Sequence, residues 1–261
     1  MSFAAKLLRV ARHELGHRVR VSRALGSTRG AVRDAVEALS RSGYYLREGF
    51  WDATTVDRWN ERLGSFYLEA KRPSEHVRPG GIRWHHVEQD FPDLHRSYTQ
   101  DPFIQAVVTA YQGESNFLKI TYQYSYADAR VWAAREDGPE IGLGRAWHSD
   151  NWMHGLKTIL FLSDITSQTG PFTFVPRTHN LFFDAPSLHR LSVFWRTIPP
   201  DPFDSNALYF RSREMGKNTG RSEPVPIVGP RGTLVIVDTR GMHRAAVVRE
   251  GERKVLWNYF S

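Results

Sequence analysis

Hydrophobic residues are spaced differently in the two halves of the chain. Before residue 112 they recur every three or four positions, which is the period of an amphipathic helix. From residue 116 onward they form short runs of β-branched and aromatic residues separated by turn-forming residues, a pattern typical of strands. This order predicts an α+β protein in which helices precede a mainly β core.

The first half of the chain predicts four helices, at residues 1–25, 31–42, 53–70 and 101–112. Asp52 stands directly before the third helix, where an aspartate can cap the first turn. A short strand at 44–46 is expected after the second helix. Residues 71–98 contain several prolines and glycines, so we expect a loop there.

The second half predicts eight short strands, at residues 117–126, 145–150, 157–163, 172–175, 224–228, 232–238, 243–248 and 253–260. Long connections are expected at 127–144 and 180–223. Short strands of this number indicate an antiparallel double sheet or jelly roll. We expect one domain over residues 31–261, preceded by a basic N-terminal arm or helix at residues 1–30.

The positive charge of the chain is concentrated at its N-terminus. Residues 1–29 carry seven Lys or Arg residues and one acid, Glu14, which accounts for +6 of the net charge of +7. The remaining residues are nearly neutral, so a nucleic-acid-binding face is not indicated. The arm either packs on the domain or makes a weak peripheral contact with an anionic membrane surface.

The chain contains no cysteine. Disulfides, zinc–thiolate sites, iron–sulfur clusters and cysteine nucleophiles are therefore excluded, and any metal must be held by His, Asp or Glu. No apolar run approaches the roughly 18 residues of a transmembrane helix, and the N-terminus lacks the apolar core of a secretory signal. We therefore expect a cytoplasmic location.

His148 and Asp150 are the first candidates for metal ligands. They are separated by one residue near the end of a predicted strand, so both side chains point to the same side of it. His86 and Glu88 show the same spacing, but they lie in the predicted loop 71–98. We therefore favour His148 and Asp150.

His243 is the candidate for the third ligand, because it follows the strongly β-branched run at 232–238 after a short turn. Two histidines and one carboxylate leave about three coordination positions open, which is the arrangement of Fe(II) oxygenases. A zinc or manganese jelly-roll hydrolase or isomerase is the alternative. Zinc enzymes need a base beside the bound water, and no glutamate is obviously placed for that role.

Arg253 opens the last predicted strand and would enter the mouth of the barrel. A buried guanidinium needs an anionic partner, and it can hold a dicarboxylate cosubstrate by two hydrogen bonds. Alternatively Arg253 lies at the surface and pairs with Glu250 or Glu252. Arg244 and Arg249 are other candidates for the same role.

A zinc-protease pattern, His-Glu-x-x-His, is present at residues 13–17. Too few residues precede it to form the strand that normally lies beside such a helix, and Gly16 interrupts the helix. We therefore interpret His13 and His17 as polar residues of a helix and not as metal ligands.

These residues, in this order, resemble the phytanoyl-CoA dioxygenase family of Fe(II)- and 2-oxoglutarate-dependent oxygenases. The resemblance covers about residues 35–261 and is most specific from 145 onward. The matching stretches are Trp147–Asp150, Leu162–Thr166, Gly170–His179, Gly232–Leu234 with His243, and Arg253. Arg177 and Thr178 stand where the family usually has Gly-Ser, and Ala245 stands where relatives often have a serine that touches the cosubstrate.

The resemblance implies a double-stranded β-helix, a cupin-like jelly roll, with N-terminal buttressing helices. It also implies Fe(II) ligation by His148, Asp150 and His243, 2-oxoglutarate held by Arg253, and a structural role for His179. Lys157 and Tyr124 are expected to line the barrel and contact the cofactors.

The implied activity is that of a dioxygenase, which uses O2 to hydroxylate or otherwise oxidise a small molecule. The arginines in the predicted loops raise the hypothesis of an anionic substrate. The alternative from another class is a catalytically silent barrel that binds a ligand without turnover.

Overall fold

Two antiparallel sheets form the body of the protein. The computed structural model describes residues 3–70, 72–74, 76–113, 116–132, 147–150, 154–180, 208–210 and 222–260. Within them the larger sheet has seven strands, in the order β1 (Tyr44–Arg47), β10 (Leu234–Asp238), β6 (Leu156–Phe161), β12 (Glu252–Phe260), β4 (Phe117–Tyr126), β3 (Gly81–His85) and β2 (His76–Arg78). The smaller sheet has the order β8 (Leu208–Phe210), β5 (Trp147–Ser149), β11 (His243–Ala245), β7 (Phe172–Phe174) and β9 (Val225–Ile227).

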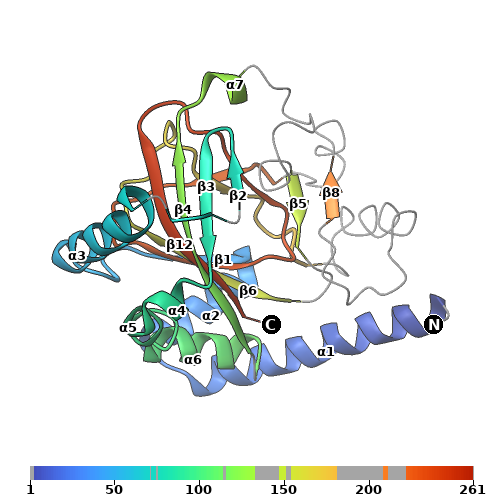
Figure 1. Ribbon diagram of the computed structural model, residues 1–261. Helices are drawn as coiled ribbons and strands as arrows, with labels where there is room; N and C mark the ends of the chain where they lie inside the picture. Colours follow the sequence, from blue (N-terminus) through green and yellow to red (C-terminus); the bar gives the residue numbers. More distant parts are fainter. Residues whose placement is uncertain are drawn as a thin grey trace.

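The central strands of the larger sheet are buried on both faces, because helices cover one face and the smaller sheet covers the other (Figure 1). Side chains alternate between the two faces of a strand. On β6, Leu160 therefore packs in the cluster on the helix side, whereas Ile159 and Phe161 pack between the sheets. This two-sided burial explains why β6 and β10 are almost continuous apolar runs.

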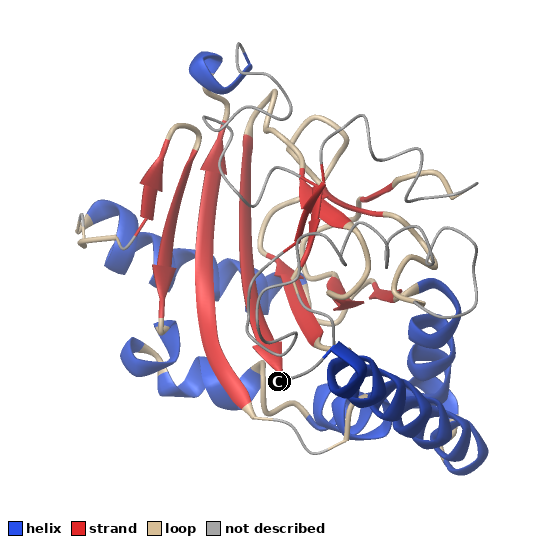
Figure 2. Ribbon diagram, turned by 90° about the vertical axis from the view of Figure 1, so that its right-hand side faces the viewer, coloured by secondary structure: helices blue, strands red, loops and turns tan. Residues whose placement is uncertain are grey.

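Helices pack along the outer face and one end of the larger sheet, as Figure 2 shows from a second direction. They are α1 (Phe3–Ser27), α2 (Gly30–Ser42), α3 (Ala53–Leu63), the π-helix η1 (Gly64–Glu69), α4 (Val87–Asp90), α5 (Pro92–Ser97) and α6 (Pro102–Tyr111). The short helix α7 (Ala129–Trp132) lies beyond the opposite end of β4 (Figure 1). Asp52 caps α3 by accepting a hydrogen bond of 2.7 Å from the Thr55 amide, as the sequence predicts. Among the described helices, none has both the length and the apolar character needed to cross a bilayer.

The N-terminal helix α1 packs against α2 and α6 at one end of the body. Val21 and Ala24 lie in the core cluster on the helix side, and the polar residues Glu14 and His17 are buried on the same face of α1. The opposite face of the helix exposes three apolar side chains, Leu8, Leu15 and Val19. The part of α1 from Glu14 to Ala24 thus packs on the rest of the protein.

The prediction of a loop at residues 71–98 is wrong, because strands β2 and β3 and helices α4 and α5 lie in this range. The hairpin forms by long-range pairing: β3 extends the larger sheet beside β4, and Trp84 stacks on Tyr122 with 5.5 Å between ring centroids. Its strands are short and lie at the edge of the sheet, so they lack a clear hydrophobic alternation. The predicted connection at 180–223 contains β8, and residues 181–207 and 211–221 lie outside the described part.

Candidate metal centre

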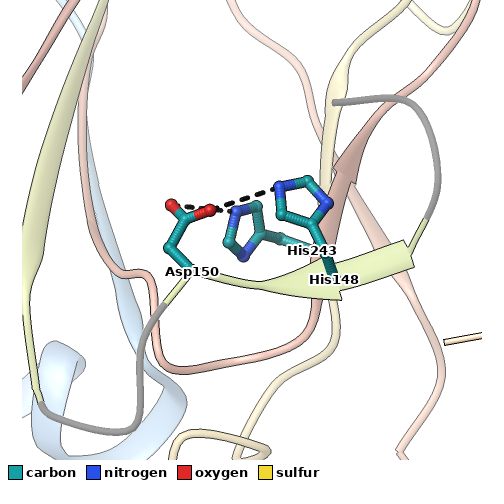
Figure 3. A group of neighbouring side chains, drawn as sticks. All are labelled: His148, Asp150 and His243. Atoms are coloured by element: carbon teal, nitrogen blue, oxygen red, sulfur yellow. Dashed lines mark ion pairs between the residues drawn. The ribbon is translucent and has the colours of Figure 1, made fainter. Parts of the chain in front are cut away.

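His148, Asp150 and His243 converge at the inner side of the smaller sheet (Figure 3). His148 on β5 and His243 on β11 are directly opposite each other in an antiparallel pair, and their ring centroids are 4.3 Å apart. Asp150 follows β5. Its Oδ1 lies 3.4 Å from His148 Nε2, and its Oδ2 lies 3.5 Å from His243 Nε2. Within the described residues, no other three His, Asp or Glu side chains offer ligand atoms this close together.

The orientation of His243 suits metal coordination through Nε2. Its Nδ1 lies 2.8 Å from the Gly241 carbonyl oxygen, so Nδ1 carries the proton and donates to that carbonyl. Its Nε2 is buried and has no hydrogen-bond partner in the described part of the chain. A buried polar atom without a partner costs free energy, and histidines that bind metal through one nitrogen usually donate the other N–H to an acceptor. A metal ion therefore fits this arrangement.

The charges at the centre also suit a cation. Burial acts to raise the pKa of Asp150, but the neighbouring His243 and His148 imidazoles outweigh burial and hold that pKa well below its usual range. Burial and the nearby His148 lower the pKa of His243. Both groups are thus in their metal-binding forms, a carboxylate and a neutral imidazole, at neutral pH. Tyr259 orients the carboxylate by donating a hydrogen bond of 3.0 Å to Asp150 Oδ2.

A cavity of about 210 Å³ lies beside the triad and is lined by residues from the inner faces of both sheets. Its described lining contains no glutamate, and Asp150 is the carboxylate among the lining residues. The base that a zinc hydrolase needs beside its water is therefore not among the described residues of this cavity.

Arg253 lines the same cavity as the triad and is 6% exposed. Its guanidinium donates to the Gly170 carbonyl oxygen and, over 3.3 Å, to the Ser125 hydroxyl. Both of these acceptors are uncharged oxygens. Arg253 is thus placed to hold an anion inside the barrel, and not at the surface with Glu250 or Glu252.

Lys157 also lines the cavity, on β6. Its ammonium group lies 4.3 Å from the centroid of the Trp257 ring and donates to the Tyr259 hydroxyl over 3.2 Å. Burial lowers the pKa of Lys157 to about 8, although the Asp150 carboxylate opposes this shift. Lys157 is therefore linked to Asp150 through Tyr259, which hydrogen-bonds to both side chains.

Tyr124 does not line the cavity, unlike the other sequence-predicted site residues. It packs against the cluster on the helix side of the larger sheet. Because side chains alternate along β4, the neighbouring Gln123 lines the cavity instead, and Ser125 contacts Arg253. The pairing of Arg253 with Ser125 and of Val255 with Gln123 places these residues there. Gln123 and Ser125 can be assigned to the cavity only from the register of β4 against β12, and not from the residue spacing within β4 alone.

The other candidate residues lie away from the cavity. Arg244 lies over the Trp147 ring, 4.7 Å from its centroid, and Arg249 is exposed. Glu88 accepts a hydrogen bond of 2.8 Å from the Ile120 amide, which is a structural role. His179 is buried, and its Nε2 lies 3.2 Å from the Ser40 carbonyl oxygen. Burial lowers the pKa of His179 to about 4, so it is a neutral packing residue.

Similarity to known proteins is found in structure and not in sequence. No family model matches the chain, and no curated protein matches it. The epimerase SnoN, solved with Fe3+, alpha ketoglutarate and nogalamycin RO, matches with a TM-score of 0.60 and 17% identity over 88% of this chain and 83% of that chain. EctD from S. alaskensis with bound Fe matches with a TM-score of 0.62 and 16% identity, over 89% and 76% of the two chains.

A third solved structure is also similar. HygX from Streptomyces hygroscopicus, solved with nickel, 2-oxoglutarate and hygromycin B, matches with a TM-score of 0.56 and 13% identity over 88% of this chain and 86% of that chain. The chain has the double-stranded β-helix fold. This confirms the predicted mainly β architecture with buttressing helices. In this double-stranded β-helix the candidate metal centre lies between the two sheets.

Proposed function

We propose that this protein is an Fe(II)- and 2-oxoglutarate-dependent dioxygenase that oxidises a small molecule. The observation that supports this function is the presence of two elements in one cavity: the triad of His148, Asp150 and His243, and the buried cation Arg253. The first suits Fe(II), because two imidazoles and one carboxylate leave open coordination positions. The second suits a dicarboxylate cosubstrate.

The residues of the chain divide the work of binding. His148 and His243 would coordinate the iron through Nε2 and Asp150 through its carboxylate. When bound, iron supplies the redox centre for the overall reaction, in which 2-oxoglutarate, O2 and a substrate C–H bond give succinate, CO2 and a C–OH group. Tyr259 keeps the carboxylate oriented by donating to Oδ2. Phe172, Val255 and other apolar lining residues exclude water from the reacting groups.

Arg253 would bind the distal carboxylate of 2-oxoglutarate. Its position on the last strand, against Gly170 and Ser125, fixes the guanidinium in the cavity that also contains the metal ligands. A cosubstrate held there at one end can reach the metal centre with its other end. A buried charge pair of this kind is strong, because both groups are shielded from water.

The cavity favours an anionic substrate. Its described lining contains three cationic residues, Arg83, Lys157 and Arg253, and one carboxylate, Asp150. Iron and 2-oxoglutarate add opposite charges of equal size, so the described lining retains an excess of positive charge when both are bound. A carboxylate or phosphate group on the substrate would balance that excess.

The proposal is tested by the conversion of 2-oxoglutarate to succinate under air with added Fe(II), without a substrate. The wild-type protein should form succinate slowly, and Asp150→Ala should form none, since the variant loses one of its three metal ligands. Thr109→Ala, an exposed residue of α6 outside the cavity lining, should match the wild type. A wild-type protein that binds 2-oxoglutarate without producing succinate would indicate a silent ligand-binding barrel instead.

A further inference from the structure

The turn at residues 238–241 holds both segments that carry metal ligands. The Thr239 carbonyl oxygen accepts a hydrogen bond of 2.9 Å from the Asp150 amide. The Gly241 carbonyl oxygen accepts the hydrogen bond of 2.8 Å from His243 Nδ1. One turn therefore fixes the backbone at Asp150 and the ring orientation at His243, so a displacement of this turn moves two of the three ligands.

Buried charges hold the turn in place. Asp238, at the end of β10, accepts hydrogen bonds from the Arg240 amide at 3.1 Å and the Tyr111 hydroxyl at 2.9 Å, and it also binds His154 Nδ1. Burial acts to raise the pKa of Asp238, but His154, together with His179 and Arg240, outweighs it and holds that pKa well below its usual range. The Arg240 side chain is 1% exposed, and its Nη1 lies 2.5 Å from His154 Nε2.

A carboxylate of the N-terminal helix pairs with Arg240. Glu14 on α1 is 4% exposed, and its Oε2 accepts a hydrogen bond of 2.6 Å from Arg240 Nη1. Its Oε1 accepts a second one, of 3.1 Å, from Arg18 Nε. Burial acts to raise the pKa of Glu14, but the hydrogen bond with His154 and the charge of Arg240 outweigh it, so Glu14 remains a carboxylate.

Two histidines on the same face of α1 also contact His154, which binds Asp238 and Arg240. His17 stacks on His154 with 3.6 Å between ring centroids, and His13 Nε2 accepts a hydrogen bond of 3.2 Å from the His154 amide. The His-Glu-x-x-His spacing places His13, Glu14 and His17 on one side of α1, as it does in a metalloprotease motif. Here, in the described residues, they contact His154 and Arg240 and form no group of three metal ligands.

We propose that Glu14 is a positioning residue for the metal centre, which it controls through Arg240 and the 238–241 turn. This inference rests on the proposed metal site, and it does not require the proposed reaction. Loss of the Glu14 carboxylate removes the charge-assisted hydrogen bond of 2.6 Å that fixes the Arg240 guanidinium, so it displaces Arg240 and with it the turn. Groups that orient metal ligands typically change metal affinity by about 10- to 100-fold.

The test is the dissociation constant of Co(II), used as an oxygen-stable probe, measured by calorimetry on the metal-free full-length protein. Glu14→Gln should weaken Co(II) binding by about 10- to 100-fold and change the visible Co(II) spectrum. Arg240→Gln should have a similar effect. Because Glu14 acts through Arg240, the effects of the two substitutions should not add. The double variant should bind Co(II) about as tightly as the single variant with the lower affinity.

The matched control is Glu88→Gln. It removes a different, partly buried carboxylate, which accepts a hydrogen bond from the Ile120 amide and lies away from the 238–241 turn. It should lower thermal stability and leave the Co(II) dissociation constant within about twofold of wild type. If Glu14 only docked the helix, Glu14→Gln would behave like this control at temperatures well below its melting temperature. That result would overturn the proposal.

A milder variant covers the case in which Glu14→Gln does not fold. Glu14→Asp keeps the charge but moves it away from Arg240, so binding should weaken by several-fold; unchanged affinity in this folded variant would equally overturn the proposal. Failure of the proposed function is a separate result. It appears as wild-type protein that binds Co(II) tightly but produces no succinate with Fe(II) and 2-oxoglutarate.

Discussion

Arg253→Gln removes the guanidinium that the proposed cosubstrate needs, and it leaves the metal ligands in place. Arg253 is 6% exposed, so two hydrogen bonds from it to a carboxylate are shielded from water. At about 1.5–3 kcal/mol for each charged hydrogen bond, their loss costs about 3–6 kcal/mol. Since about 1.4 kcal/mol corresponds to a factor of ten, the dissociation constant for 2-oxoglutarate should rise roughly 100- to 10,000-fold.

The assay is anaerobic calorimetric titration of the Co(II)-loaded protein with 2-oxoglutarate. Lys254→Gln is the matched control, because it removes the adjacent cation, whose ammonium group pairs with Glu252 at 2.6 Å. That variant should bind 2-oxoglutarate within about twofold of wild type. An Arg253→Gln variant that keeps its affinity within threefold, while Lys157→Met loses it, would refute the assignment and make Lys157 the carboxylate-binding residue.

Three further predictions concern the metal centre and its surroundings. Tyr259→Phe removes the 3.0 Å hydrogen bond to the carboxylate of Asp150, a proposed metal ligand, so Co(II) affinity should fall about fivefold, for a loss of about 1 kcal/mol; calorimetry showing unchanged affinity would contradict this. Burial lowers the pKa of His17 to about 2 and of His179 to about 4, so below pH 6.5 the unfolded chain binds protons that the folded chain excludes. Stability should therefore fall on acidification from pH 6.5 to 4.5, by up to about 1.4 kcal/mol per pH unit for each histidine, and a constant urea midpoint over that range would contradict it. A Cβ at Gly241 would lie 2.2 Å from the Phe174 ring, so Gly241→Ala should lower stability by about 1–3 kcal/mol and weaken Co(II) binding, whereas a thermal melt equal to wild type would show that the turn adapts.

The strands and the metal triad could be predicted because their signals are local. The alternation of side chains in a strand places His148 and Asp150 on one side, and the run before His243 marks a buried strand that ends near them. Arg253 follows from the same alternation, with Val255 and Trp257 on the cavity face of β12. The structure brings all four site residues to one cavity.

Other parts of the fold and site depend on contacts that are distant in sequence. The hairpin of β2 and β3 forms only because β4 offers an edge for pairing, and no local alternation marks it. Tyr124 and Gln123 are neighbours, so a shift of one position decides which of them faces the cavity. The role of Glu14 depends on Arg240, which is 226 positions away, and a motif read within one helix suggests a different chemistry.

The central claim is that His148, Asp150 and His243 bind one Fe(II) ion that shares its cavity with 2-oxoglutarate. The most direct measurement is the visible spectrum of the anaerobic protein with one equivalent of Fe(II), titrated with 2-oxoglutarate. We predict a weak charge-transfer band that saturates at one equivalent and is absent in Asp150→Ala. A wild-type protein that binds Fe(II) but develops no band at saturating 2-oxoglutarate would contradict the account.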